Sequence, residues 1–300
     1  MRILITGVYG FVGSYFARMA IDMGHEVVGF SRLSNMKNKD RINSIVENPN
    51  FTMIHGDLTN PNDTSELCED IDVVVNFVSK TSQSIANITG TINLLESAKK
   101  YKPKLFIQIS TDKVYGFTTE GLYDEYQTLN PNTTYAASKA SSDMYCLSYF
   151  NEHQVPVIIT RAENNYGPYQ TPHKTNIPGW IKNSLNDKTI NVFEHKKQSW
   201  LHVQDHCYAI FHIIKKGLLG EIYNIAGNEN CYDVDIVNKI LNMTNSKSKI
   251  VLQNKPDRNR WYGINSERLR MLGWKTQYSI DTSLKQTIEW YKLNEWWWFR

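Results

Sequence analysis

The sequence predicts an α/β fold: a doubly wound parallel sheet followed by a smaller α+β region. Strand-like and helix-like segments alternate from Met1 to about Arg161, which is the signature of a parallel sheet covered by helices on both faces. A glycine-rich turn joins the first strand to the first helix, and the regular alternation ends soon after Arg161. A chain of 300 residues, 41% of them hydrophobic, is long enough to build both parts.

The first strand and the first helix flank the glycine turn. Arg2–Thr6 is a short apolar strand, and Ser14–Met23 has apolar residues at helical spacing. Between them, Gly7 allows a tight turn, Gly10 lets a pyrophosphate approach the backbone, and Gly13 permits close helix packing. This context predicts a Rossmann dinucleotide site with the phosphates at the helix N-terminus. The turn residues expected to line the cofactor are Gly7, Gly10, Phe11, Val12 and Gly13.

The end of the second strand bears on the choice of cofactor. His25–Phe30 is followed by Ser31 and Arg32, where an NAD site usually carries an acid for the ribose diol. A hydroxyl and a guanidinium suit a 2′-phosphate instead, because they offer charge-assisted hydrogen bonds that a carboxylate would oppose. We therefore expect NADP in preference to NAD. An ordinary solvated loop position is the alternative for Arg32.

Two further strands and a helix continue the alternation. Phe51–His55 is the third strand, and Asp57 and Leu58 after it complete the expected cofactor residues. Asp57 could accept a hydrogen bond from the adenine amino group, or merely cap the following helix. Asp72–Phe77 is the fourth strand, and residues 87–101 have the apolar face of a helix.

The most informative stretch begins with the fifth strand, Phe106–Ile109. Thr111, Asp112 and Lys113 follow it, so they are expected at the carboxyl end of the sheet, where open α/β sheets bind their ligands. A hydroxyl, a carboxylate and an ammonium group at one edge form a set of acid and base groups.

A tyrosine and a lysine stand four residues apart in the next helix, which is expected over about 134–152. Tyr135 and Lys139 therefore share one helix face. The ammonium group favours the phenolate, so that Tyr135 can take a proton from an alcohol, and Thr111 would orient the same alcohol. Both helix residues are also expected to contact the cofactor, since Lys139 could reach the nicotinamide ribose. Val155–Thr160 closes the series of strands.

The pattern loosens after about residue 165. We expect 1–165 to form the dinucleotide-binding domain and 166–300 the substrate domain, with about 200–227 returning to the first. Residues 164–174 are rich in Pro, Gly and side-chain donors, which indicates a loop. The helices expected beyond it are 180–185, 203–215, 233–243 and 281–293, and the strands are 190–193, 222–225 and 250–252.

Composition excludes several classes of function. The formal net charge is only +3, so no overall field would attract nucleic acid or an anionic membrane. No apolar run is long enough to predict a membrane span or a signal peptide. The four cysteines are scattered, without the spacing of a metal site, so we expect no metal and a reducing, cytoplasmic location.

Together these motifs resemble those of extended short-chain dehydrogenases/reductases, and most closely those of nucleoside-diphosphate-sugar 4,6-dehydratases of the dTDP-glucose 4,6-dehydratase type. The G-x-x-G-x-x-G turn and the Y-x-x-x-K pair mark the superfamily, whereas N-N-Y-G-P-Y-Q at 164–170 and E-W-W-W at 295–298 are specific to the dehydratase branch. The resemblance covers nearly the whole chain. It implies a lyase that binds a nucleoside-diphosphate sugar and a tightly held NAD(P), which is regenerated in each turnover.

The resemblance also implies a mechanism. Tyr135 removes the C4 hydroxyl proton during oxidation, the resulting ketone acidifies C5, water is eliminated across C5 and C6, and hydride returns to C6. Asp112 matches the acid for the departing C6 hydroxyl. Lys113 stands where the dTDP-glucose enzymes carry a glutamate as the C5 base, and a lysine can act as a base only if desolvation or a nearby cation such as Lys139 lowers its pKa. An Asp-Lys pair also occurs in related dehydratases that act on CDP-glucose or UDP-N-acetylglucosamine.

The substrate positions match the family in part. Asn164, Lys174 and Arg260 match positions that hold the nucleotide and its phosphates, with an ordinary surface role as the alternative for each. Gln198 replaces an arginine that resembles a diphosphate ligand, so either a neighbouring lysine substitutes for it or phosphate binding is rearranged. The segment from 79 to 91 is several residues shorter than in the family.

The resemblance implies a homodimer through the helices at 87–101 and 134–152. Two other functions stay open. An epimerase or simple oxidoreductase acting at C4 needs Tyr135 but has no use for Asp112 and Lys113. A catalytically silent protein that binds a sugar nucleotide would need none of the three.

Overall fold

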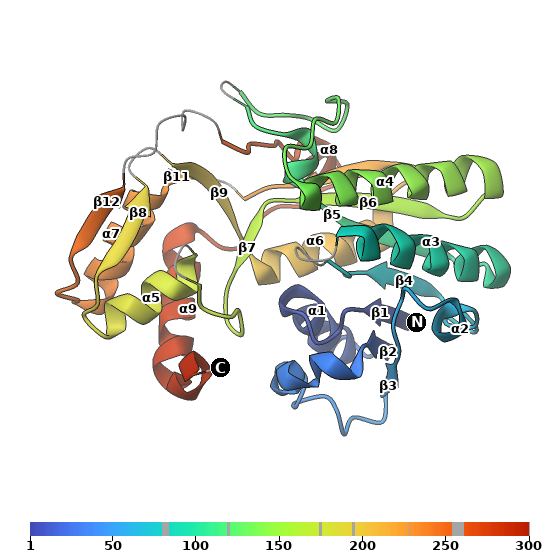
Figure 1. The fold of residues 1–300 in the computed structure, drawn as a ribbon, viewed down its shortest axis with the longest axis horizontal. Coiled ribbons are helices and arrows are strands. Elements are labelled where there is room, and N and C mark those ends of the chain that lie inside the picture. Colours follow the sequence, from blue (N-terminus) through green and yellow to red (C-terminus); the bar gives the residue numbers. More distant parts are fainter. Residues whose placement is uncertain are drawn as a thin grey trace.

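A parallel sheet forms the larger part of the molecule (Figure 1). The computed structural model describes residues 1–79, 84–118, 121–173, 176–193, 196–227, 229–253 and 261–299. Within these ranges seven strands form one sheet in the order β10-β6-β5-β4-β1-β2-β3, and every neighbouring pair is parallel. The strands are β1 (Arg2–Thr6), β2 (Glu26–Ser31), β3 (Phe51–His55), β4 (Val73–Asn76), β5 (Leu105–Thr111), β6 (Val157–Ala162) and β10 (Ile222–Ile225). The predicted doubly wound parallel sheet is confirmed.

Helices cover both faces of this sheet because successive strand residues point to opposite sides. Ile3 and Ile5 of β1 pack in the cluster formed with α1 and α6, whereas Leu4 packs with α3 and α4. Both clusters are buried and apolar, as expected for a sheet that is covered on two faces. The covering helices are α1 (Phe11–Asp22), α3 (Ser84–Tyr101), α4 (Thr134–His153) and α6 (Val203–Lys216), and shorter helices are α2 (Pro61–Thr64), η1 (Leu33–Arg41) and η2 (Asp112–Tyr115).

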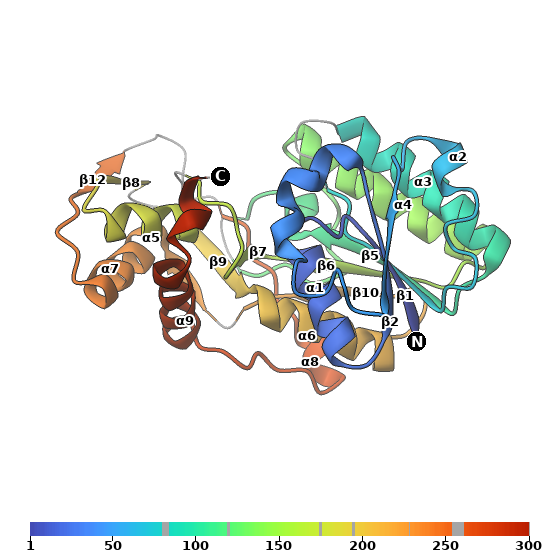
Figure 2. The same ribbon diagram turned by 90° about the horizontal axis from the view of Figure 1, so that it is seen from below.

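A second, smaller lobe lies at one end of the sheet and contains the C-terminus (Figures 1 and 2). Trp180, Trp200 and Trp297 are buried in its apolar core. Its strands form one sheet in the order β11-β9-β7 and a second of β12 with β8, counted over the described residues. The remaining elements are β7 (Asn164–Tyr166), α5 (Ile177–Leu185), β8 (Ile190–Phe193), β9 (Lys197–His202), β11 (Asn230–Tyr232), α7 (Asp233–Thr244), β12 (Ile250–Gln253), α8 (Glu267–Met271), α9 (Ile280–Leu293) and η3 (Glu295–Phe299).

The chain crosses between the two parts more than once. β10 pairs with β6 at the edge of the large sheet, and α8 packs against β10. Segments that follow residue 200 therefore return to the large sheet. In the described part of the chain no helix is long and apolar enough to cross a bilayer.

Some boundaries differ from the sequence-based ones. α1 begins at Phe11, directly after Gly10, rather than at Ser14. α5 begins at Ile177, where the side chain of Asn176 accepts a hydrogen bond from the Gly179 amide and caps the helix. Both helices therefore begin three residues earlier than the apolar periodicity predicts, directly after Gly10 and Asn176.

Candidate active site

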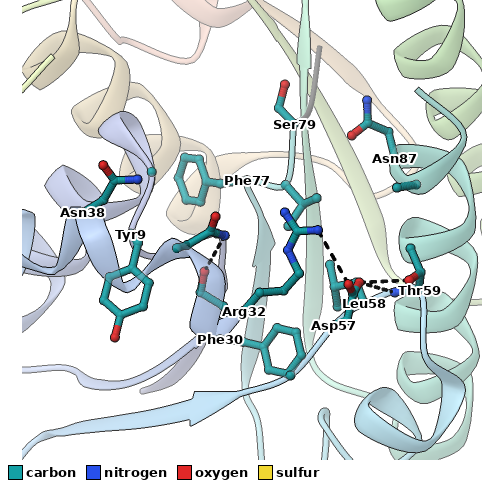
Figure 3. Close-up of a pocket in the computed structure, with 17 residues that line it drawn as sticks. Tyr9, Phe30, Arg32, Asn38, Asp57, Leu58, Thr59, Phe77, Ser79 and Asn87 are labelled. Carbon is teal, nitrogen blue, oxygen red and sulfur yellow. Dashed lines mark hydrogen bonds and ion pairs between the residues drawn. The ribbon is translucent and has the colours of Figure 1, made fainter. Parts of the chain in front are cut away.

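A cleft at the carboxyl ends of the sheet strands brings many of the predicted residues together. One cavity of about 300 Å³ is lined both by the glycine turn and by Thr111, Lys113 and Tyr135. A second cavity of about 290 Å³ extends towards the ends of β2 and β3 (Figure 3). The two cavities share Gly7, Gly10, Phe77 and Ser79 in their walls. They are therefore two halves of one elongated cleft, at the place where open α/β sheets bind ligands.

The glycine turn fits a diphosphate. Gly7 has a φ of +70° that favours glycine, and a Cβ atom added at Gly13 would lie 2.7 Å from the Gly7 carbonyl oxygen. No side chain caps α1 at Gly10, so the amides of its first turn are left to a ligand. All five predicted turn residues line the cleft, namely Gly7, Gly10, Phe11, Val12 and Gly13.

The two residues predicted to read the cofactor ribose lie in the other half of the cleft. Ser31 is buried, and the Asn35 side-chain amide donates to its hydroxyl at 3.2 Å. A guanidinium nitrogen of Arg32 lies 3.6 Å from an Asp57 carboxylate oxygen, as Figure 3 shows. Arg32 is thus an ion-paired residue of the cleft wall rather than a solvated loop arginine.

Asp57 is held by its own loop. Its carboxylate accepts from the amide and the hydroxyl of Thr59, at 3.0 and 2.9 Å. Burial alone would raise the pKa of Asp57, but these bonds and Arg32 outweigh it and lower the pKa. The following helix, α2, is capped by Asn60, so the alternative that Asp57 caps it is wrong. Leu58 lines the same half of the cleft, as predicted.

Tyr135 and Lys139 lie near the start of α4, which Thr133 caps. Lys139 is almost fully buried, and its ammonium donates to the Val78 carbonyl at 3.4 Å. Burial lowers the pKa of Lys139, although the nearby Asp143 carboxylate counteracts part of the effect. The Tyr135 hydroxyl lies in the cleft and is 2.8 Å from the Ser79 hydroxyl.

Thr111 and Asp112 form the next contact. Thr111 is the last residue of β5, and its hydroxyl donates to an Asp112 carboxylate oxygen at 2.9 Å. Asp112 begins η2 and its side chain is 1% exposed. The Thr111 proton is therefore directed at Asp112, whereas the sequence predicted that Thr111 orients the alcohol that Tyr135 deprotonates.

Lys113 is held in place by two neighbours. Its ammonium lies 3.4 Å from an Asp112 carboxylate oxygen and 2.8 Å from the Asn164 side-chain oxygen. Burial by itself would lower the pKa of Lys113, but the Asp112 carboxylate, together with Tyr135 and Tyr262, outweighs burial and the net pKa is raised. A lysine that acts as a base needs a lowered pKa. The pKa of Lys113 is raised instead, because the attraction of the nearby Asp112 carboxylate for the ammonium charge exceeds the effect of burial.

Hydrogen bonds continue from Asn164 into the second lobe. The Asn164 amide donates to the Gln198 side-chain oxygen at 3.3 Å, and the Gln198 amide donates to both oxygens of Asp233 at 2.7 and 2.9 Å. Asp233 is buried and lies 3.3 Å from the Lys196 ammonium. The Gln198 amide thus donates its hydrogen bonds to the Asp233 carboxylate, whereas an arginine at this position would bind a diphosphate. Two predicted substrate residues, Lys174 and Arg260, lie outside the described residues, as do residues 80–83 of the shortened segment.

Other polar residues line the catalytic half of the cleft without having been predicted as site residues. Glu163 is buried, its carboxylate accepts from the Gly227 amide at 2.8 Å, and burial raises its pKa to about 8. His206 pairs with Asn165 at 2.9 Å, and burial lowers its pKa to about 3. Ser79 follows the end of β4, so the strand-end rule that identified Thr111 could also have found it.

Comparisons with known proteins agree with this geometry. The model of the family described as "NAD dependent epimerase/dehydratase family" matches residues 3–226. The chain is 32% identical to a dTDP-glucose 4,6-dehydratase of Streptomyces niveus, over 99% of this chain and 95% of that protein. It is 31% identical to the low-salt glycan biosynthesis protein Agl12 of Haloferax volcanii, over 97% and 98% of the two chains.

Solved structures are similar over the same extent. A dTDP-glucose 4,6-dehydratase of Bacillus anthracis, crystallised in complex with NAD, has a TM-score of 0.92 and 36% identity, covering 100% of this chain and 99% of that one. A UDP-glucuronic acid 4-epimerase of Bacillus cereus, in complex with UDP-glucuronic acid and NAD, has a TM-score of 0.89 and 26% identity, covering 98% and 99%. The motifs, the cleft and these similarities establish that the chain belongs to the NAD dependent epimerase/dehydratase family of extended short-chain dehydrogenases/reductases.

Proposed function

We propose that the protein is a nucleoside-diphosphate-hexose 4,6-dehydratase, a lyase of the EC 4.2.1 type that makes a 4-keto-6-deoxy sugar nucleotide. The observation that carries the proposal is the contact of Asp112 with Lys113 beside Tyr135 at one cleft. An enzyme that only oxidises C4 needs the tyrosine alone, whereas elimination needs an acid and a base as well. The full-length relatives named dTDP-glucose 4,6-dehydratase support the same class of reaction.

The oxidation step rests on α4 and the glycine turn. When bound, the nicotinamide supplies a reversible two-electron oxidation, taking hydride from C4 and giving it back at C6. The turn residues hold the diphosphate, and Tyr135 takes the C4 hydroxyl proton. Lys139 lies one helical turn away on the same face of α4.

The elimination step uses Asp112 and Lys113 as one coupled unit. In the ion pair the proton is on Lys113, but elimination requires it on Asp112. Transfer of that one proton across the 3.4 Å contact gives a neutral amine that can accept the C5 proton and a neutral acid that can protonate the C6 hydroxyl. A bound sugar that displaces water favours this neutral pair, because burial penalises both charges. Loss of water restores the ion pair. The Lys113 ammonium then gives its proton to C5 when the double bond between C5 and C6 is reduced, and the proton that Tyr135 took from the C4 hydroxyl replaces it on Lys113, so the proton count is balanced.

The substrate is a nucleoside-diphosphate hexose, with Asn164 and Gln198 beside its sugar and diphosphate and with Lys174 and Arg260 as further predicted contacts. Relatives that are named dTDP-glucose 4,6-dehydratase support a substrate of this class. The contact between Gln198 and Asp233 supports a different arrangement around the diphosphate, because a buried carboxylate repels phosphate unless a cation accompanies it. Lys196, which is paired with Asp233 just before β9, is a cation that could accompany this carboxylate.

For the cofactor we propose NADP rather than NAD. Ser31 and Arg32 offer a hydroxyl and a guanidinium in the ribose half of the cleft, and Arg32 offsets the negative charge of Asp57. The related Bacillus anthracis structure contains NAD, which is the competing outcome. Denaturing the purified protein and identifying the released nucleotide decides between them, and recovery of NAD without NADP contradicts this part of the proposal.

Assembly and location complete the proposal. We propose a homodimer through α3 and α4, whose outer residues Ile85, Met144 and Tyr145 are exposed in the single chain. We also propose a cytoplasmic location, in which Cys68, Cys146, Cys207 and Cys231 stay reduced, since all four are free thiols. Size-exclusion chromatography with light scattering tests the dimer.

One observation favours a second function, a 4-epimerase. The raised pKa of Lys113 opposes its role as a base, and a solved epimerase shares the fold. Incubation with dTDP-, UDP-, CDP- and GDP-hexoses, followed by mass spectrometry, separates the two functions. A product lighter by one water supports the dehydratase, unchanged mass with altered stereochemistry supports the epimerase, and binding without turnover rejects both.

A further inference from the structure

Ser79 lies beside the reacting oxygen of the site. It follows β4, and its hydroxyl is 2.8 Å from the Tyr135 hydroxyl, a normal O–H···O distance. Ser79 lines both halves of the cleft, at the point where they meet. Figure 3 shows Ser79 beside Phe77, at the opposite end of the second cavity from Phe30.

The hydroxyl expected to assist Tyr135 is otherwise engaged. Thr111 has one proton to donate, and it donates it to Asp112 at 2.9 Å. The Thr111 hydroxyl oxygen also accepts a hydrogen bond from the Lys113 backbone amide at 3.4 Å. Both of these contacts of the Thr111 hydroxyl are therefore with residues of η2, not of α4. The hydroxyl contact that the structure gives Tyr135 comes from Ser79.

We propose that Ser79 is a positioning residue that donates a hydrogen bond to the ionised oxygen of Tyr135. A phenolate can only accept, so in the base form of Tyr135 the proton of this contact must come from Ser79. A hydrogen bond to a charged acceptor is stronger than one to a neutral acceptor, so Ser79 favours the ionised form. The inference rests on Tyr135 as the base, which the dehydratase and the epimerase share.

The segment that carries Ser79 is tied to the same helix twice. The Val78 carbonyl accepts from the Lys139 ammonium, and the next residue along contacts Tyr135. The end of β4 is therefore held against one face of α4 by residues four positions apart. Other charges also act on Tyr135: Lys113 interacts with it electrostatically from η2, and Lys139 lies one turn along α4.

The test compares Ser79→Ala with wild type in the oxidation half-reaction, followed as reduced nicotinamide in single-turnover experiments. We expect a rate lower by about 10-fold, at the low end for a hydrogen bond to a charged group. The acid limb of the pH profile is expected to move up by about one pH unit, the equivalent of that factor. Ser79 is exposed, so the fold should be retained, and Ser79→Thr should restore both values.

Two controls make the result decisive. In a Tyr135→Phe background, Ser79→Ala should cause no further loss, because the contact has already been removed. Thr111→Val should slow the reaction without moving the acid limb. An unchanged acid limb in Ser79→Ala, or an equal loss with and without Tyr135, overturns the proposal. Because the half-reaction precedes elimination, these outcomes are independent of whether water is lost.

Discussion

The two chemical groups in the cleft are built from different parts of the molecule. Tyr135 and Lys139 lie one turn apart on α4, opposite the glycine turn of the same large sheet. The Asp112–Lys113 pair is instead tied through Asn164 to β9 and α7 of the smaller lobe. The oxidation apparatus is therefore set by local spacing, whereas the elimination pair is set by contacts between distant segments. Substitutions should separate the two.

The largest expected effect is the loss of the shared first step. Tyr135→Phe removes the base for the C4 hydroxyl, and we expect oxidation to slow by about 10³-fold, within the range of general-base catalysis. Both reduced nicotinamide and product should decline together in stopped-flow and mass measurements. If product formation persisted at the wild-type rate, Tyr135 would not be the base of the oxidation step, and the division into oxidation and elimination residues would be wrong.

A smaller but selective effect is expected from Asp112→Asn. Water loss should fall by about 10²-fold, while C4 oxidation changes little, because the amide cannot donate the acidic proton. The same change removes the carboxylate that most strongly opposes the effect of burial on Lys113, so the pKa of Lys113 should fall. Acylation of Lys113 as a function of pH measures this. A pKa that does not fall contradicts the electrostatic account of the pair.

Contacts with the smaller lobe should matter less. Gln198→Ala frees Asn164 from Asp233, and we expect KM to rise by about 5-fold, the loss of roughly one neutral hydrogen bond. Gln253→Ala, which removes an amide from exposed β12 in the same lobe, is the matched control and should change nothing. Equal KM values for the two variants would show that the hydrogen-bond chain from Asn164 to Asp233 does not position the substrate.

A further effect concerns stability, rather than catalysis, at the junction of the two lobes. Burial raises the pKa of Glu163 to about 8, above the ordinary unfolded value, so the folded protein binds the extra proton between these values. Stability contributed by the neutral form is therefore lost as the pH rises towards 8, with a slope of up to about 1.4 kcal/mol per pH unit. Urea unfolding at pH 5 to 8 should show a flatter profile for Glu163→Gln than for wild type. Parallel profiles would place the pKa of Glu163 near its ordinary value.

Sequence patterns were sufficient wherever local spacing decides the structure. The glycine turn, the strand ends and the Tyr135–Lys139 spacing predicted the sheet and many of the residues that line the cleft. The direction of the Thr111 hydroxyl and the pKa of Lys113 could not be predicted, because each depends on Asp112 and on which neighbour its proton meets. Asp233 was also missed as a partner of Gln198, since the two are 35 residues apart and meet only when β9 packs beside α7.

In the proposed elimination, Lys113 exchanges a proton with Asp112 and then accepts the C5 proton. The most direct test is turnover in D₂O by wild type and by Lys113→Met, a change that removes the amine and keeps an unbranched side chain only one atom shorter. We predict that wild type loses water and incorporates deuterium at C5, while the variant still oxidises C4 but neither exchanges C5 nor loses water. Deuterium incorporation and water loss by Lys113→Met at the wild-type rate would contradict the account.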